Sequence, residues 1–123
     1  GLRDEAALAE ARRRKGGLPA WRMRLIEARL AADLPAPQIE ELAALCGMTV
    51  RQLGRAFKQE TGRTLGRFID EAVHERACVL LGQGALGIGA IAAKLGFASS
   101  GSFTCAFRRL AGIAPSEFRR RGV

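Results

Sequence analysis

The sequence contains no tyrosine, one histidine and three cysteines, so it has few of the residues that usually perform catalysis or bind metal ions. His74 has no evident partners for a catalytic triad or a histidine-based metal site. The cysteines are too far apart for a zinc-binding cluster, and the glycines within residues 82–89 lack the Lys-Ser/Thr of a phosphate-binding loop. We expect reduced thiols and no metal, organic cofactor or enzymatic activity. The three cysteines are Cys46, Cys78 and Cys105.

Long apolar runs are also missing. No run approaches the roughly 18 residues of a membrane span, and the N-terminus does not resemble a secretory signal. Alternating runs of β-branched residues are too short for a sheet, whereas every strong periodic signal is helical. With 123 residues, of which 48% are hydrophobic, the chain is large enough to bury a core. The sequence predicts a soluble, cytoplasmic, all-α protein of about seven helices.

Positive charge is abundant and unevenly placed. The formal net charge is +8. Residues 38–83 hold six basic and six acidic side chains, whereas residues 84–123 hold six basic side chains against Glu117 alone. This excess favours a polyanionic partner, although basicity by itself fits DNA, RNA, anionic lipid or solubility.

Helix start and stop signals divide the chain into segments. Residues 1–17 read as a linker or frayed helix. We predict a first helix-turn-helix subdomain over residues 18–63, a linker helix over residues 64–83 and a second subdomain over residues 84–123. The signals are Pro19 at N1, caps at Thr49 and Ser99, terminators at Gly62, Gly82, Gly84 and Gly112, and Pro115 opening a last short helix.

The two predicted subdomains share a sequence pattern. A shift of 49 residues superimposes Ile39, Ala43, Ala44 and Gly47 on Ile88, Ala92, Ala93 and Gly96. A shift of 50 superimposes Ala56, Phe57, Gly62 and Phe68 on Ala106, Phe107, Gly112 and Phe118, so the second copy has one more residue in its turn. A small residue at the helix crossing and a glycine four residues later are what a helix-turn-helix requires. The sequence therefore predicts a homeodomain-like tandem of two such units.

The stretch "IAAKLGFASSGSFTCAFRRLAGIAPSEFRR", supported by "LAALCGMTVRQLGRAFKQETGRTLGRFI", resembles the C-terminal DNA-binding domain of the AraC/XylS family of bacterial transcription regulators. The resemblance covers about residues 19–121. It implies seven helices and two recognition helices that enter successive major-groove segments of double-stranded DNA. It also implies a sensing or dimerisation domain before residue 1.

The first recognition helix is predicted to read bases with the face opposite Leu53 and Phe57. That face holds Arg51, Gly54 and Arg55, and arginine can donate two hydrogen bonds to guanine. Lys58 lies further along and suits phosphate, as does the Thr49 hydroxyl at the helix start. The sequence therefore assigns base reading to the arginines of this copy.

The corresponding face of the second copy carries short side chains. Gly101, Thr104 and Cys105 stand where base-reading residues are expected, which departs from the usual family pattern of longer polar side chains. We therefore expect this unit to read few bases and to hold mainly the DNA backbone, although Thr104 or Cys105 can still contact a thymine methyl. The predicted backbone contacts are Ser99, Ser100, Ser102 and Arg108.

Several residues have structural alternatives. Arg76 falls within the apolar stripe of the linker helix, which favours a buried pair with a carboxylate. Residues 119–121 suit phosphate contact or a favourable helix end, and we favour phosphate. A solvent-exposed face of the linker helix is predicted to hold Arg67, Glu71, His74 and Cys78.

Two other functions remain open. The first is a non-specific nucleic-acid-binding protein, for which the net charge alone suffices. The second is a helical module that binds a protein such as RNA polymerase through the same faces.

Overall fold

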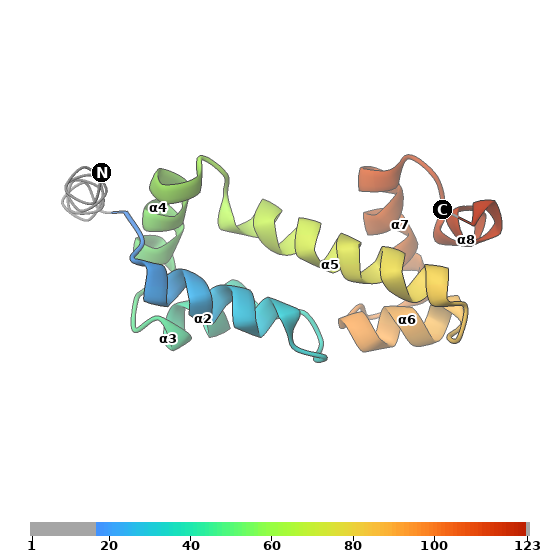
Figure 1. Cartoon of the computed structure of the whole chain (residues 1–123), viewed down its shortest axis with the longest axis horizontal. Coiled ribbons are helices and arrows are strands. Elements are labelled where there is room, and N and C mark those ends of the chain that lie inside the picture. The colour runs from blue at the N-terminus through green and yellow to red at the C-terminus, as the bar shows by residue number, and fades with distance from the viewer. Residues whose placement is uncertain (1–16, 123) are drawn as a thin grey trace, which may run out of the picture. The chain divides into compact units, whose positions relative to one another are not determined.

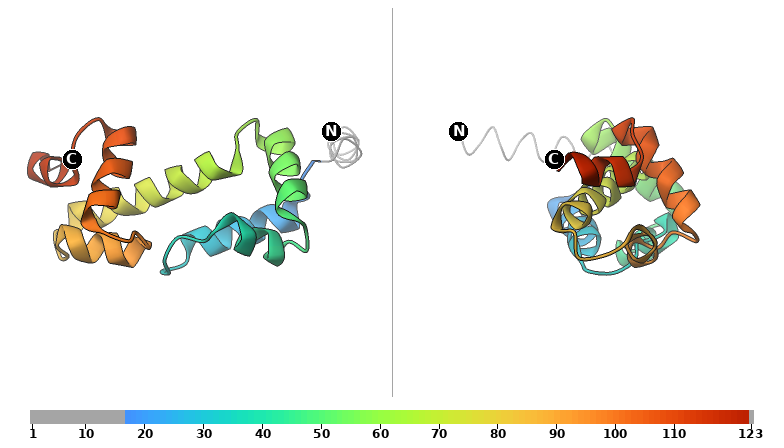
Figure 2. Two further views of the ribbon diagram at one scale, coloured as in Figure 1. Left: turned by 180° about the vertical axis from the view of Figure 1, so that it is seen from behind. Right: turned by 90° about the vertical axis from the view of Figure 1, so that its right-hand side faces the viewer.

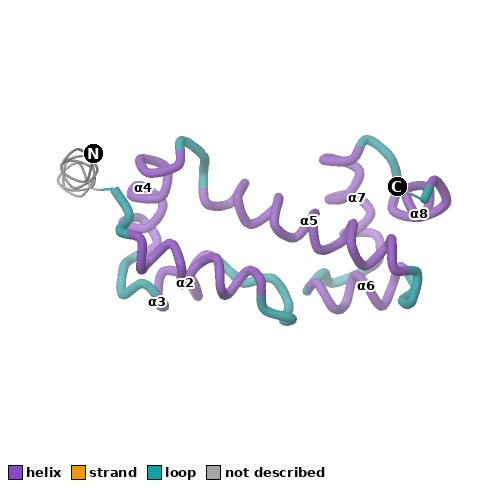
Figure 3. Tube along the Cα trace, in the orientation of Figure 1, coloured by secondary structure: helices purple, strands orange, loops and turns teal. Residues whose placement is uncertain are grey.

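The computed structural model describes residues 17–122. Within this range the chain forms seven α-helices and no strand. Figures 1 and 3 show these helices in the ribbon and tube views. The predicted all-α fold is therefore confirmed, whereas the predicted linker over residues 1–17 lies outside the described residues except for Gly17. The helices are α2 (Ala20–Ala31), α3 (Ile39–Leu45), α4 (Val50–Thr61), α5 (Leu65–Gln83), α6 (Ile88–Leu95), α7 (Ser100–Ala111) and α8 (Pro115–Arg121).

Two helix ends differ from the prediction. Pro19 is the N-cap of α2, with an extended backbone (φ −65°, ψ 154°), and is not the first helical residue. Helix α5 continues through Gly82 to Gln83, and Gly84 leaves it with a φ of +71°. Gly82 has the helical conformation that any residue can adopt, so only Gly84 uses the freedom of glycine to end the helix.

The chain divides into two compact units. Unit 1 comprises residues 17–32 and Pro37–Ile69, and unit 2 comprises Asp33–Ala36 and residues 70–122. Helix α5 thus contributes its first turn to unit 1 and the remainder to unit 2. The short segment Asp33–Ala36 belongs to unit 2 although it precedes the first helix-turn-helix in the sequence.

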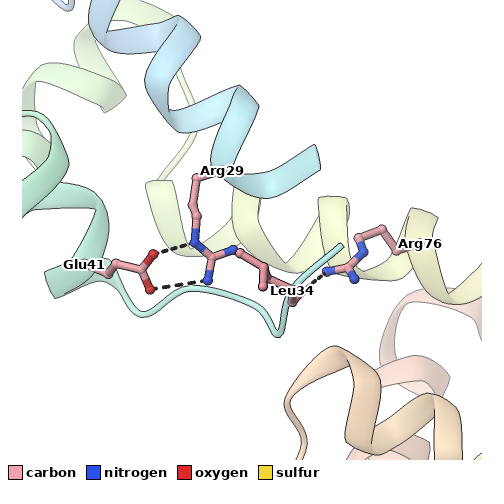
Figure 4. Close-up of polar contacts among 4 residues, drawn as sticks. All are labelled: Arg29, Leu34, Glu41 and Arg76. Atoms are coloured by element: carbon pink, nitrogen blue, oxygen red, sulfur yellow. Dashed lines mark hydrogen bonds and ion pairs between the residues drawn. The ribbon is translucent and has the colours of Figure 1, made fainter. Parts of the chain in front are cut away.

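Unit 1 is built from α2, α3, α4 and the start of α5. Helix α3 contacts both α2 and α4. The fully buried side chains come from all three helices, and Phe57 of α4 also packs on Phe68 of α5 with ring centroids 5.0 Å apart. On the surface of the unit, Arg29 of α2 pairs with Glu41 of α3 (Figure 4). The buried residues at the centre are Ile26, Leu42, Cys46, Leu53 and Phe57.

Unit 2 has an aromatic core. Helix α7 crosses α6 and also contacts α8, and the crossing of α6 and α7 is visible from front and back (Figures 1 and 2). Phe103 packs on Phe97 and Phe107 with centroid distances of 5.4 and 5.9 Å, and Phe107 packs on Phe118 at 5.4 Å. Ile91 and Leu95 of α6 are also buried in this unit.

The two helix-turn-helix turns have the same hydrogen bonds. The amides of Met48 and Phe97 each donate to the carbonyl of the residue five positions earlier, Ala43 and Ala92, at 2.9 Å in both copies. Gly47 and Gly96 have positive φ angles of 67° and 97°, as predicted. The small residues Ala43 and Ala92 are buried, so the predicted role of a small residue at each crossing is confirmed.

Arg119 has a structural role, whereas the sequence favoured phosphate contact for residues 119–121. Its guanidinium donates to the carbonyls of Leu81 (3.1 Å) and Leu86, near the C-terminal end of α5. These carbonyls have no partner within a helix, so Arg119 is a structural cap. Arg121 pairs with Glu117 at 2.9 Å, whereas Arg120 is exposed.

His74 and its neighbours correct the predicted exposed face of α5. Arg67 is exposed, but Glu71, His74 and Cys78 are half-buried. The His74 ring lies 4.8 Å from the Phe107 ring, so α7 covers this side of α5. His74 Nε2 is 3.6 Å from the Cys78 sulfur, and Nδ1 is buried without a hydrogen-bond partner among the described residues.

This environment predicts a pH-dependent stability. Burial lowers the pKa of His74 below its usual 6.5, with a smaller opposing effect from Glu75. The unfolded chain therefore binds a proton more readily than the folded chain. The free energy of unfolding should hold its full value above pH 6.5 and decrease as the pH falls below it, until the folded-state pKa is passed. Urea titrations at about pH 7.5 and 5.5 measure this decrease, and His74→Gln should reduce it; an equal decrease in both proteins would contradict the assignment.

Candidate nucleic-acid interface

Helix α4 begins with a capping box. The Thr49 hydroxyl accepts a hydrogen bond from the Gln52 amide at 3.1 Å, and the Gln52 side chain accepts one from the Thr49 amide at 3.0 Å. Arg51 and Arg55 are exposed on the side of α4 away from buried Leu53. The first copy therefore presents two guanidinium groups one helical turn apart, on a helix whose start is fixed by its cap.

Lys58 and Gly54 complete this face of α4. Lys58 is exposed in the last turn, where a cation also suits the helix dipole. Gly54 is half-buried, and a methyl group added to it would meet no atom within 4 Å. The absence of a side chain at Gly54 is therefore not imposed by packing.

Helix α7 begins with the equivalent capping box. The Ser99 hydroxyl accepts from the Ser102 amide at 3.1 Å, and the Ser102 hydroxyl accepts from the Ser99 amide at 3.2 Å. Both hydroxyls thus have structural partners, whether or not they also reach phosphate. Ser100 is exposed near α6, since a methyl group added to Gly89 would lie 3.3 Å from its hydroxyl oxygen. A side chain at position 89 would therefore require the Ser100 hydroxyl to shift by a few tenths of an ångström.

The exposed face of α7 carries mostly short side chains, as the sequence predicted. Gly101, Cys105 and Arg108 are exposed, Thr104 is half-buried, and buried Phe103 lies on the other side. Arg108 is the one long cationic side chain among the four face residues. This face can therefore offer small polar contacts and a single positive charge.

Removal of either cap should lower stability by a similar amount. Thr49→Ala and Ser99→Ala each leave a helix N-terminal amide without its acceptor, which costs about 1 kcal/mol, within a range of roughly 0.5–2 kcal/mol. Urea denaturation of the two variants measures the change. Thr49→Ser should restore the bond and most of the stability. A cap variant as stable as the unmodified chain would contradict these roles.

The three cysteines are free thiols. Burial raises the pKa of the thiols of Cys46 and Cys78, and Glu75 adds to the effect at Cys78. Cys105 is exposed on α7. The described residues contain no group of three or more potential metal ligands. None of the described helices combines the length and apolarity of a membrane-spanning segment.

The family of the chain follows from comparison with known proteins. The family model described as "Helix-turn-helix domain" matches residues 42–121. The regulator RipA of Corynebacterium glutamicum is 36% identical over 105 residues, which cover 82% of this chain and 31% of RipA. A transcriptional regulator with an AraC-type DNA-binding domain from Chromobacterium violaceum has a TM-score of 0.67 and 29% identity, covering 83% of this chain and 88% of that chain. The chain belongs to the AraC-type helix-turn-helix family.

Another solved structure with this AraC-type fold is the DNA-binding domain of the global transcriptional factor AdpA in complex with a target DNA. It has a TM-score of 0.73 and 24% identity, covering 81% of this chain and 90% of that chain. The present chain spans about a third of the length of the curated relatives that it matches.

Two arginine contacts with backbone carbonyls in this AraC-type domain were not predicted from the sequence. Arg22 of α2 donates from Nε to the Cys46 carbonyl at 3.0 Å, at the turn of the first copy. Arg76 donates to the Leu34 carbonyl at 2.7 Å and lies 3.7 Å from the Asp33 carboxylate. The predicted carboxylate partner of Arg76 is thus Asp33, but this carboxylate is exposed and the shorter bond is to a backbone carbonyl.

Proposed function

We propose that the chain is the DNA-binding module of a bacterial transcriptional regulator and binds double-stranded DNA in a sequence-specific manner. Two capped recognition helices, α4 and α7, would enter successive major-groove segments. The observation that carries the proposal is the duplicated arrangement of turn, cap and exposed polar face on a chain with a net charge of +8. The similarity to a regulator with an AraC-type DNA-binding domain, and to the AdpA domain in complex with a target DNA, supports it.

We propose different tasks for the two recognition helices. Arg51 and Arg55 of α4 would donate to base edges, with Gly54 between them allowing close approach, and Lys58 and Thr49 would contact phosphate. Helix α7 would mainly contact the DNA backbone, through Arg108 and the serines at its start. Gly101, Thr104 and Cys105 would contact few base edges. The serines are Ser99, Ser100 and Ser102.

For the whole regulator, we propose a cytoplasmic protein without enzymatic activity, in which this module is linked to a sensing or dimerisation domain. The greater length of its relatives supports an additional domain. RNA polymerase is the protein partner proposed for its helical surface.

Competition binding tests sequence-specific binding. A site is first selected from a random DNA pool with this chain, and its affinity is compared with that of a scrambled duplex at about 0.15 M salt. A specific binder should prefer the selected site by a factor of about 10³ or more. Equal, salt-dependent affinity for both duplexes would indicate a non-specific nucleic-acid-binding protein, and no salt-dependent binding at all would favour a protein-interaction module.

A further inference from the structure

We infer that the segment Asp33–Ala36, here called the 33–36 segment, positions the second recognition helix, α7. The segment precedes the first helix-turn-helix in the sequence but belongs to unit 2. The inference rests on the proposed DNA-binding function, because its consequence is a change in DNA affinity. It is carried by three sets of contacts within unit 2.

The first contact caps the C-terminal end of α6. The Ala36 amide donates to the Leu95 carbonyl at 2.9 Å. Leu95 is the last residue of α6, so its carbonyl accepts no hydrogen bond within that helix. The equivalent carbonyl of the first copy, 49 positions earlier, is that of Cys46, which accepts from Arg22. Each turn therefore receives a donor from outside its motif, and the 33–36 segment supplies the donor of the second turn.

The second contact is with the turn glycine. A methyl group added to Gly96 would lie 3.1 Å from the Pro35 side chain and 3.3 Å from the Ala36 nitrogen. A methyl group added to Gly47 in the first copy would meet nothing within 4 Å. Only the second turn is closely covered. Since Ser99, the N-cap of α7, follows Gly96 by three residues, the covered turn is the one from which α7 starts.

The third set of contacts is electrostatic. The Asp33 carboxylate lies 3.1 Å from Lys94 Nζ and 3.7 Å from the Arg76 guanidinium. Arg76 also donates to the Leu34 carbonyl, as Figure 4 shows. Cations from α5 and α6 thus hold the segment on the turn, and a charge-assisted bond to a carbonyl is among the stronger hydrogen bonds. Asp33 is exposed, so its removal should loosen the segment without unfolding the unit.

The sign of the Asp33→Asn effect provides the test. The substitution removes a negative charge from a protein that binds a polyanion, so electrostatics alone would raise DNA affinity. The inference predicts the opposite for the complete selected site: a loss of about two- to tenfold, because the start of α7 is less well fixed. Affinity for a shorter duplex that keeps only the half-site bound by α4 should be unchanged or slightly higher. Asp33→Glu should restore most of the affinity for the complete site.

Glu75→Gln is the matched control, since Glu75 is an exposed acid of unit 2 with no hydrogen bond or ion pair in the described chain. For each duplex, its affinity should be equal to or slightly higher than that of the unmodified chain. If Asp33→Asn behaves like Glu75→Gln on both duplexes, the inference is overturned. If the unmodified chain does not prefer the selected site to a scrambled one, the proposed function fails instead.

Amide exchange supplies a measurement without DNA. The Ala36 amide should exchange slowly in the unmodified chain, and at least tenfold faster in Arg76→Gln, where the Leu34 carbonyl loses its partner. An Ala36 amide that exchanges at the rate of an unstructured peptide in the unmodified chain would also overturn the inference.

Discussion

Arg55→Ala should weaken binding to the selected site by about five- to 150-fold, which corresponds to roughly 1–3 kcal/mol, and should remove the preference at one base pair. Arg55 is exposed on α4, one turn after Arg51 and opposite the buried Leu53. A guanidinium at this position can donate two parallel hydrogen bonds to guanine. Arg55→Lys should not restore the preference, because an ammonium group lacks this planar geometry.

Arg108→Ala is the comparison for Arg55→Ala. Arg108 is also exposed on its recognition helix, but we assign it to the DNA backbone. Its removal should weaken binding to all sequences alike and reduce the slope of log affinity against log salt by about one. Affinities of both variants for the selected site and its single-base variants separate the two roles. Unchanged affinity and preference in Arg55→Ala would show that the base-reading assignment is wrong.

Phe107→Ala should cost about 3–5 kcal/mol of the free energy of unfolding. The Phe107 ring is buried at 2% exposure and contacts the rings of His74, Phe103 and Phe118 at 4.8, 5.9 and 5.4 Å. Truncation removes this ring from the centre of the unit 2 core and leaves a cavity. The loss is a large fraction of the 5–15 kcal/mol that stabilises a typical domain, so α7 should no longer be held in place.

Leu110→Ala is the matched control on the same helix. Leu110 is 47% exposed, so its truncation should change the free energy of unfolding by no more than about 0.5 kcal/mol. Urea denaturation followed by circular dichroism measures both variants. A Phe107→Ala variant that loses no more stability than Leu110→Ala would contradict the aromatic core described for unit 2.

Much of the fold could be predicted because its signals are local. The positive φ of Gly47 and Gly96, the caps at Thr49 and Ser99, and the helical spacing of buried residues each depend on neighbours within a few positions. The repeat strengthened these signals, since each one occurs twice. Within the candidate interface, exposure of Arg51, Arg55 and Lys58 followed from their place opposite Leu53 and Phe57.

The contacts that were missed join distant parts of the chain. The Arg119 contact with Leu81 and the Ala36 contact with Leu95 both involve backbone carbonyls, which leave no mark on the sequence of the acceptor. A cation that caps a helix is indistinguishable, by residue type, from one that contacts phosphate. For this reason the sequence left Arg119 between phosphate contact, which we favoured, and a helix end, whereas the structure places its guanidinium at the end of α5.

The prediction that one face of α5 is exposed was wrong for a related reason. Helical periodicity identifies the most apolar stripe, but it does not show that a second helix covers the polar side. Phe107 of α7 packs on His74 and thereby half-buries a side chain that periodicity alone places in solvent. A lone histidine carries no sequence signal for this contact.

A base-by-base substitution scan of the selected site tests the central claim most directly. We expect two blocks of sensitive positions with centres one helical turn, about 10–10.5 base pairs, apart. Substitutions in the block bound by α4 should cost about 1–3 kcal/mol each, and those in the block bound by α7 should have shallow effects. A single sensitive block, or two blocks with equally deep discrimination, would contradict the account of one reading helix and one holding helix.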